Sequence, residues 1–234
     1  EDCKAALVRC VSRTSAPLLD EVRALVQDVE EMGEQVGMGQ APALSGLLNG
    51  EWELLYAPED ITRSSPFFWA FRRAFPEQSD QIFGITDSIP ASLKEVGPAY
   101  QTIQLDSQST PATGSLVSRV KVATLGGMAT SIMTTRCTIL RVEGLDGIRL
   151  RVDTTKPEES TILQKLGPLG DIIASNSPAF PSGDTLDRVM PGSSEVVMRT
   201  TYCDESIRIS RNDDLFDEIF VWKRKDFGTG EFEI

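Results

Sequence analysis

The chain has 234 residues, a hydrophobic content of 40% and a formal net charge of −12. This length fits one sizeable domain or two small ones. The negative charge argues against nucleic acid and against broad adsorption to anionic lipid, because both depend on clustered Lys and Arg. The absence of histidine removes the Ser-His-Asp and Cys-His catalytic arrangements and the commonest metal ligand. We therefore expect neither a nucleic-acid partner nor a metal site.

The four cysteines are Cys3, Cys10, Cys137 and Cys203. None belongs to a Cys-x-x-Cys pair, which argues against a zinc or redox motif. Cys3 and Cys10 are about two helical turns apart and could share a face, but we interpret them as two reduced structural thiols. The sequence has no apolar run of the length that spans a bilayer, and we expect no transmembrane helix. The chain begins at Glu1 without methionine and without a signal-like leader, which indicates that a targeting peptide was removed or that the chain was trimmed.

The first forty residues show the apolar spacing of a helix. Pro17 suits its first turn, and Gly37 and Gly39 suit its end. We predict that residues 1–45 are a helical segment packed on the remainder of the chain, with a partner-binding helix as the alternative. The apolar residues that recur at i, i+3 and i+4 are Leu18, Leu19, Val22, Leu25, Val26, Val29, Met32 and Val36.

The stretch after this helix combines a turn with a strand. Asn49 and Gly50 favour a chain reversal, and Trp52, Leu54 and Tyr56 then fall on one side of the strand that follows. A Gly-x-Trp at the start of a first strand resembles the lipocalin signature, in which the Trp closes one end of a barrel with a cation stacked on it. The simpler interpretation is that Trp52 is a large core residue, and we expect this in either case.

The next segment, residues 62–76, is rich in aromatic and basic side chains. Ser65 is suited to cap a helix and Pro66 to begin it, while Pro76 ends it. Helical spacing places four phenylalanines on one face and points Trp69, Arg72 and Arg73 elsewhere; the four are Phe67, Phe68, Phe71 and Phe75. One interpretation is a helix that plugs one end of a barrel, and the other is a helix that contacts a membrane or a partner protein. For the second interpretation the contact residues are Arg63, Phe67, Phe68, Trp69, Phe71, Arg72 and Arg73.

Strand patterns dominate from residue 81 onward. With the strand at Trp52 they number about nine, which is close to what closes a small antiparallel barrel able to hold one ligand. We therefore predict a mostly β fold in residues 46–226, with a tail at 227–234. The segments with strand patterns are 81–88, 99–106, 114–125, 129–142, 148–155, 195–202, 206–210 and 217–223.

One of these strands also suggests a ligand-lining face. Period-2 alternation over residues 114–125 places one set of side chains on the inner side of the predicted barrel. We expect the lining to include Leu116, Ser118, Val120 and Val122. Ser118 is the polar residue in this otherwise apolar set.

A long connection interrupts the strand patterns. Residues 158–174 have the spacing of a broken helix, and residues 175–194 contain three prolines, two glycines and little periodicity. A connection of this length in a compact domain is usually a lid, a binding loop or a disordered segment.

Two motifs stand in order at the two ends of the predicted barrel. Gly50 and Trp52 form the first, and Asp204-x-x-x-Arg208-x-x-Arg211 before the final strand forms the second. This pairing resembles the plastid lipid-associated proteins, the fibrillins, over residues 18–225. The resemblance implies a lipocalin-like antiparallel barrel with an N-terminal helix and one or two short additional helices. It also implies a plastid location, on thylakoid membranes or plastoglobules. Separately, Arg208 or Arg211 could stack on Trp52 as a cation–π pair.

Three functions follow as hypotheses. The resemblance implies a non-enzymatic structural protein that binds lipid, carotenoid or another isoprenoid and requires no cofactor. The alternative is an extrinsic scaffold subunit docked to a photosynthetic pigment–protein complex. An enzyme would need a positioned acid or base, and the carboxylates Glu95, Asp106 and Asp153 stand in no recognisable catalytic spacing, so we expect no catalytic residues.

Overall fold

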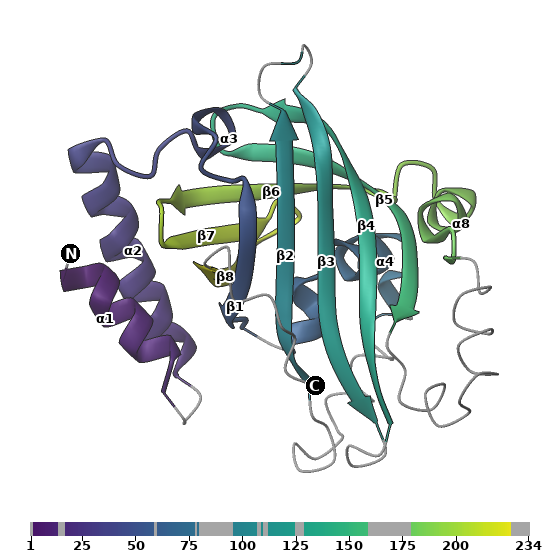
Figure 1. The fold of residues 1–234 in the computed structure, drawn as a ribbon, viewed down its shortest axis with the longest axis horizontal. Helices are drawn as coiled ribbons and strands as arrows, with labels where there is room; N and C mark the ends of the chain where they lie inside the picture. Colours follow the sequence, from purple (N-terminus) through teal and green to yellow (C-terminus); the bar gives the residue numbers. More distant parts are fainter. Residues whose placement is uncertain are drawn as a thin grey trace.

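The computed structural model describes residues 2–13, 17–58, 60–77, 79, 96–106, 109, 112–124, 129–158 and 179–225. Eight antiparallel strands form a closed ring, with helices at its outer face and at one end (Figure 1). In chain order the strands are β1 (Gly50–Tyr56), β2 (Val96–Asp106), β3 (Thr113–Thr124), β4 (Ala129–Glu143), β5 (Gly147–Glu158), β6 (Glu195–Cys203), β7 (Ile207–Asn212) and β8 (Leu215–Arg224).

The ring closes because β1 pairs with both β2 and β8. In the β1–β8 ladder, Trp52 lies opposite Arg224 and Leu54 lies opposite Trp222. Each of the eight described strands therefore has two hydrogen-bonded neighbours, so the sheet that they form has no open edge to pair with another chain. The prediction of a mostly β protein with antiparallel strands and a few helices is confirmed. The strand predicted at residues 81–88 lies outside the described residues.

Alternation along the strands separates an inner core from an outer face. Along β1, buried and partly buried residues alternate without interruption, as expected when successive side chains point to opposite faces. The inner side chains of the ring form one continuous apolar cluster. Its largest fully buried members are Trp52, Trp222, Phe220, Leu48, Ile103, Leu116, Ile139, Ile148, Leu150 and Met198.

Two helices cover the outer face of β6, β7 and β8, on the left of Figure 1: α1 (Asp2–Val11) and α2 (Leu19–Val36). The apolar stripe of α2 packs there, with Val22, Val26 and Val29 in one cluster with Ile207 and Ile209. A short helix, α3 (Pro42–Ser45), follows. Within the described chain no helix is both long and apolar enough to cross a bilayer.

The single helix predicted over residues 1–40 is in fact two helices. α1 ends at Val11, and α2 begins at Leu19 with Leu18 as its N-terminal flanking residue. Pro17 therefore lies before α2 and not in its first turn. Proline lacks a backbone N–H and disfavours helical geometry in the residue before it, so Pro17 keeps α2 from extending further toward the N-terminus.

The remaining helices lie away from the face that α1 and α2 cover (Figure 1). A 3-10 turn, η1 (Ile61–Ser64), leads into α4 (Pro66–Ala74), which is seen behind β2, β3 and β4 in Figure 1. α8 (Ser182–Val189) packs outside β5.

α8 corrects the expectation of an irregular connection over residues 175–194. Backbone hydrogen bonds in both directions join Phe180 to Thr155 of β5, and Arg151 pairs with Asp184 at 2.9 Å. This short helix therefore depends on contacts with β5, which sequence periodicity does not report. Residues 159–178, which include most of the predicted broken helix, are outside the described part of the chain.

Candidate functional site

The Gly50–Trp52 motif stands at the start of β1, the strand whose pairing with β8 closes the ring. Gly50 has a φ of 131°, a value that side chains disfavour, and it places Trp52 on the inner face, where it is fully buried. The indole Nε1 of Trp52 donates a hydrogen bond to the carbonyl oxygen of Leu48 at 2.9 Å. Two guanidinium groups lie over the Trp52 indole, with the Arg208 Cζ at 5.2 Å and the Arg224 Cζ at 4.2 Å from the indole centroid.

Arg224 was missed by the sequence analysis, although it fixes the chain before β1. Its Nη1 donates to the carbonyl oxygen of Asn49 and its Nη2 to that of Leu47, both at 2.6 Å. The informative signal is its position two residues after Trp222 in the final strand, which brings it opposite Trp52 when the ring closes.

Arg208 is the arginine of the second motif that stacks on Trp52. It is fully buried, lies 4.6 Å from the centroid of Trp222, and donates through Nη2 to the Gln101 Oε1 at 2.6 Å. Its Nε and Nη1 have no hydrogen-bond partner among the described residues, and burial lowers the pKa of the Arg208 guanidinium to about 9. Its contacts are aromatic packing and one amide, which assign it a structural role in the core.

The other two residues of this motif connect the ring to the helices. Asp204 is bound by the Lys4 Nζ of α1 at 2.8 Å and by the Tyr202 hydroxyl at 3.0 Å. Arg211 extends away from Trp52 and donates to both carboxylate oxygens of Glu30 on α2, at 2.9 and 3.0 Å. The second motif therefore attaches both α1 and α2 to the outer face.

The predicted ligand-lining residues of β3 point into the ring but serve as core. Leu116, Ser118 and Val120 are 0%, 1% and 2% exposed, and Leu116 and Val120 belong to the inner apolar cluster. In the described part of the chain they are packed against other side chains. Val122 lies in β3, but its side chain is outside the described set.

The helix proposed to contact a membrane or partner has its centre buried. Trp69 is 3% exposed, donates from Nε1 to the Arg63 carbonyl oxygen at 2.7 Å and contacts Phe220 at 5.7 Å between ring centroids. Arg63 is itself 5% exposed. The sequence analysis had Trp69 pointing away from the apolar face, and this is corrected: the indole is the buried side of α4, because a tertiary hydrogen bond fixes it there.

The other side chains of α4 divide between core and surface. Phe67, Phe71 and Phe75 are partly buried against the inner cluster. Arg72 pairs with Glu218 at 2.7 Å. Arg73 is exposed and donates to the Glu195 carbonyl oxygen. Phe68 is half-buried and makes an edge contact with Phe67, so one side of the helix is accessible and the other is not.

A double variant tests how far α4 belongs to the core. Phe67→Ser with Phe68→Ser should lower the free energy of unfolding by about 2–3 kcal/mol, since both rings are half-buried and full burial of Phe contributes about 1.5–3 kcal/mol. The measurement is urea unfolding, with Phe180→Ser as the control because Phe180 is 54% exposed. Unchanged stability with lost thylakoid co-sedimentation would instead identify α4 as a docking helix.

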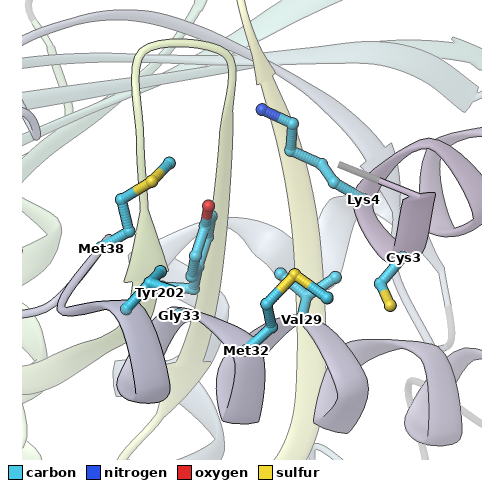
Figure 2. A pocket seen from close by; sticks show the side chains of 8 residues that line it. Cys3, Lys4, Val29, Met32, Gly33, Met38 and Tyr202 are labelled. Carbon is cyan, nitrogen blue, oxygen red and sulfur yellow. The ribbon is translucent and has the colours of Figure 1, made fainter.

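A pocket of about 300 Å³ lies outside the ring, between α1, α2 and the end of β6 (Figure 2). Sequence reasoning missed it because its residues come from separate segments. Figure 2 shows the side chains of Val29, Met32 and Met38 around the space and Tyr202 along one side. The eight lining residues are Cys3, Lys4, Val29, Met32, Gly33, Val36, Met38 and Tyr202.

Two glycines let Tyr202 form this wall. A Cβ on Gly33 would lie 2.8 Å from the Tyr202 Cε2, and one on Gly39 would lie 2.6 Å from its Cδ2. Both distances are too short for real side chains, so the Tyr202 phenol ring fits only against glycine. Burial raises the pKa of the Tyr202 phenol, which keeps it protonated and able to donate to Asp204.

The polar end of the pocket is internally neutralised. Lys4 is the cation among the lining residues, and its Nζ bonds both the Asp204 carboxylate and the Ser206 hydroxyl. The other described lining residues are Cys3, methionine, valine, glycine and one aromatic ring. Methionine is flexible and polarizable, so these walls suit an uncharged apolar ligand of variable shape.

A closed ring of antiparallel strands with an apolar interior, helices attached by the second motif and a mostly apolar pocket outside the ring define a mostly β protein. The PAP_fibrillin family model matches residues 2–222, and the chain belongs to this family. Its members are structural proteins associated with plastid lipids, which gives this chain a plastid location and a lipid-associated role. Searches of curated proteins and of solved structures returned no significant match.

Proposed function

We propose that this protein is a non-enzymatic, lipocalin-like barrel protein that holds a carotenoid, another isoprenoid or an uncharged lipid at the periphery of thylakoid membranes or plastoglobules. The pocket between α1, α2 and β6 is the site we assign to the ligand. This placement replaces the inner face of β3, whose described side chains are packed as core.

The observation that carries the proposal is the apolar pocket in a chain of this family. Its volume of about 300 Å³ is at the lower end of the range for small-molecule sites, roughly 300–1,000 Å³. It therefore suits a ring or a chain segment of a larger molecule. Because the Lys4 ammonium, the cation among the described lining residues, is already paired with Asp204, an uncharged hydrocarbon fits this pocket better than an anionic headgroup.

Filling the pocket should weaken carotenoid binding without unfolding the protein. Met32→Trp places a larger side chain at the mouth, where Met32 is 37% exposed, and we expect carotenoid affinity to fall at least tenfold. The measurement is a titration with a detergent-delivered carotenoid, followed by its absorption band. Met190→Trp is the matched control, because Met190 is 45% exposed beyond the end of α8. Equal affinity in the two variants would refute the assignment of the pocket.

A scaffold subunit docked to a pigment–protein complex is the second candidate. The observation that favours it is the accessible side of α4, with Arg73 exposed and Phe68 half-buried. Aromatic rings and arginine are the side chains most enriched at protein interfaces. Under this function the Phe67→Ser, Phe68→Ser variant would lose its complex while Met32→Trp would keep it.

A further inference from the structure

We propose that the end of the molecule formed by the last turn of α2, the loop after it and α3 rests on an uncharged lipid surface, with the pocket opening onto that surface. The inference rests on the proposed lipid-binding function and adds the contact face and the path by which a ligand enters. It differs from the α4 docking hypothesis, which uses the opposite end of the ring.

The first observation is a concentration of exposed apolar side chains at this end. Met32, Val36 and Met38 line the pocket and remain 37%, 65% and 50% exposed. Leu44, on α3, is 53% exposed. Single exposed apolar residues are ordinary, but a group around the mouth of an apolar pocket marks an interaction site.

A third segment joins the same surface. The backbone N–H of Ala43 on α3 donates to the carbonyl oxygen of Leu145 at 3.2 Å, which places the turn between β4 and β5 beside α3 (Figure 1). The Leu145 side chain is 60% exposed. The end of α2, α3 and this turn lie at one end of the molecule (Figure 1) and each carries exposed apolar side chains, as expected of a face that enters the outer layer of a lipid assembly.

The acidic side chains of α2 favour contact with an uncharged lipid surface over an anionic one. The sequence of α2 contains one basic residue, Arg23, against six acidic ones: Asp20, Glu21, Asp28, Glu30, Glu31 and Glu34. Lys4, the cation lining the pocket, is held by Asp204. Anionic headgroups attract polybasic segments and repel acidic ones within a Debye length, so lipids without net charge are the partner that this face fits.

The pocket lies beside the proposed lipid contact, which gives a ligand a direct path into it. Because Met32, Val36 and Met38 belong both to the pocket wall and to the exposed group, a ligand can pass from the lipid layer into the pocket without crossing water. Transfer of apolar surface through water is unfavourable, and this arrangement avoids it.

The test is vesicle flotation of the full chain with Leu44→Glu and Leu145→Glu. Neither residue lines the pocket, so carotenoid binding in detergent should persist while flotation with phosphatidylcholine vesicles falls at least tenfold. The control carries two added charges elsewhere, Val189→Glu with Met190→Glu, at residues that are 51% and 45% exposed, and should float like the wild type. Wild-type flotation should also weaken when phosphatidylglycerol is added to the vesicles.

Several outcomes would overturn the inference and leave the proposed function standing: undiminished flotation of the Leu44, Leu145 variant, wild-type flotation only with anionic vesicles, or wild-type carotenoid binding without flotation. Loss of flotation in Phe67→Ser, Phe68→Ser but not in this pair would place the contact on α4. If the glutamate pair misfolds, Leu44→Ser with Leu145→Ser replaces it, with the same loss expected. A wild type that binds no carotenoid would refute the proposed function itself.

Discussion

Replacing Trp52 with alanine should lower the free energy of unfolding by about 3–5 kcal/mol, the usual loss for a buried large aromatic. Trp52 has no exposed surface and belongs to the inner apolar cluster. Its removal also leaves the Leu48 carbonyl oxygen without the indole donor and removes the face on which Arg208 and Arg224 stack. The loss therefore combines a cavity, a missing hydrogen bond and two missing cation–π contacts.

Urea unfolding of the Trp52→Ala variant measures this loss directly. Phe180→Ala is the control, because Phe180 is 54% exposed and its truncation should change stability by less than about 0.5 kcal/mol. A Trp52→Ala variant with unchanged stability would contradict the assignment of Trp52 to the core of the ring.

Replacing Asp204 with asparagine should cost about 3 kcal/mol, near the lower end for removing one partner of a buried ion pair. The Asp204 Oδ1 accepts hydrogen bonds from the Ser206 N–H, the Ser206 hydroxyl and the Ile207 N–H, and Oδ2 accepts from Lys4 and Tyr202. An amide nitrogen in place of either oxygen would face donors with another donor. The side chain of Lys4 is 33% exposed, which limits the loss.

The same carboxylate predicts a pH dependence. Burial alone would raise the pKa of Asp204, but the hydrogen bonds from Lys4, Ile207 and Ser206 outweigh it and lower the pKa to about 2 from 3.8. A lowered folded-state pKa stabilises the protein above the unfolded-state pKa. This contribution should disappear as the pH falls from about 4 to about 2.

Unfolding measured across that window in the wild type and in Asp204→Asn isolates the effect. The difference in stability between them should be constant above pH 4 and should shrink below it, since other carboxyl groups titrate alike in both proteins. A difference that does not shrink on acidification would show that Asp204 contributes no charge-dependent stability.

Much of the ring could be predicted because strand patterns are local. Alternation placed Leu116, Ser118 and Val120 on one face, and they share the inner side of β3. The sequence left open whether Arg208 or Arg211 stacks on Trp52. The answer depends on which side of β7 faces inward, and the pairing of β7 with β6 and β8 decides that.

The α4 region shows where a helical pattern misleads. Spacing put the four phenylalanines on one face and Trp69 on another, yet Trp69 and Ala70 are the most buried side chains of this helix. The deciding contacts are the hydrogen bond from Trp69 to Arg63 and the packing on Phe220. Both are tertiary, and no periodicity within nine residues contains them.

The pocket could not be predicted for a related reason. Its walls combine Lys4 of α1, Met32 of α2 and Tyr202 of β6, which are distant in sequence. The sequence identifies Gly39 only as a helix-ending residue, and nothing in it shows that the Tyr202 ring packs against Gly33 and Gly39. Asp204 is likewise distant from its partner Lys4, which lies 200 residues earlier.

The most direct test of lipid binding at this pocket is the lipid content of the protein itself. Tagged wild-type and Met32→Trp chains would be isolated from plastids, and their organic extracts examined by absorption spectroscopy and mass spectrometry. The account predicts an uncharged isoprenoid or lipid close to one per chain in the wild type and a marked loss in Met32→Trp. No bound lipid in the wild type, or equal amounts in both proteins, would contradict it.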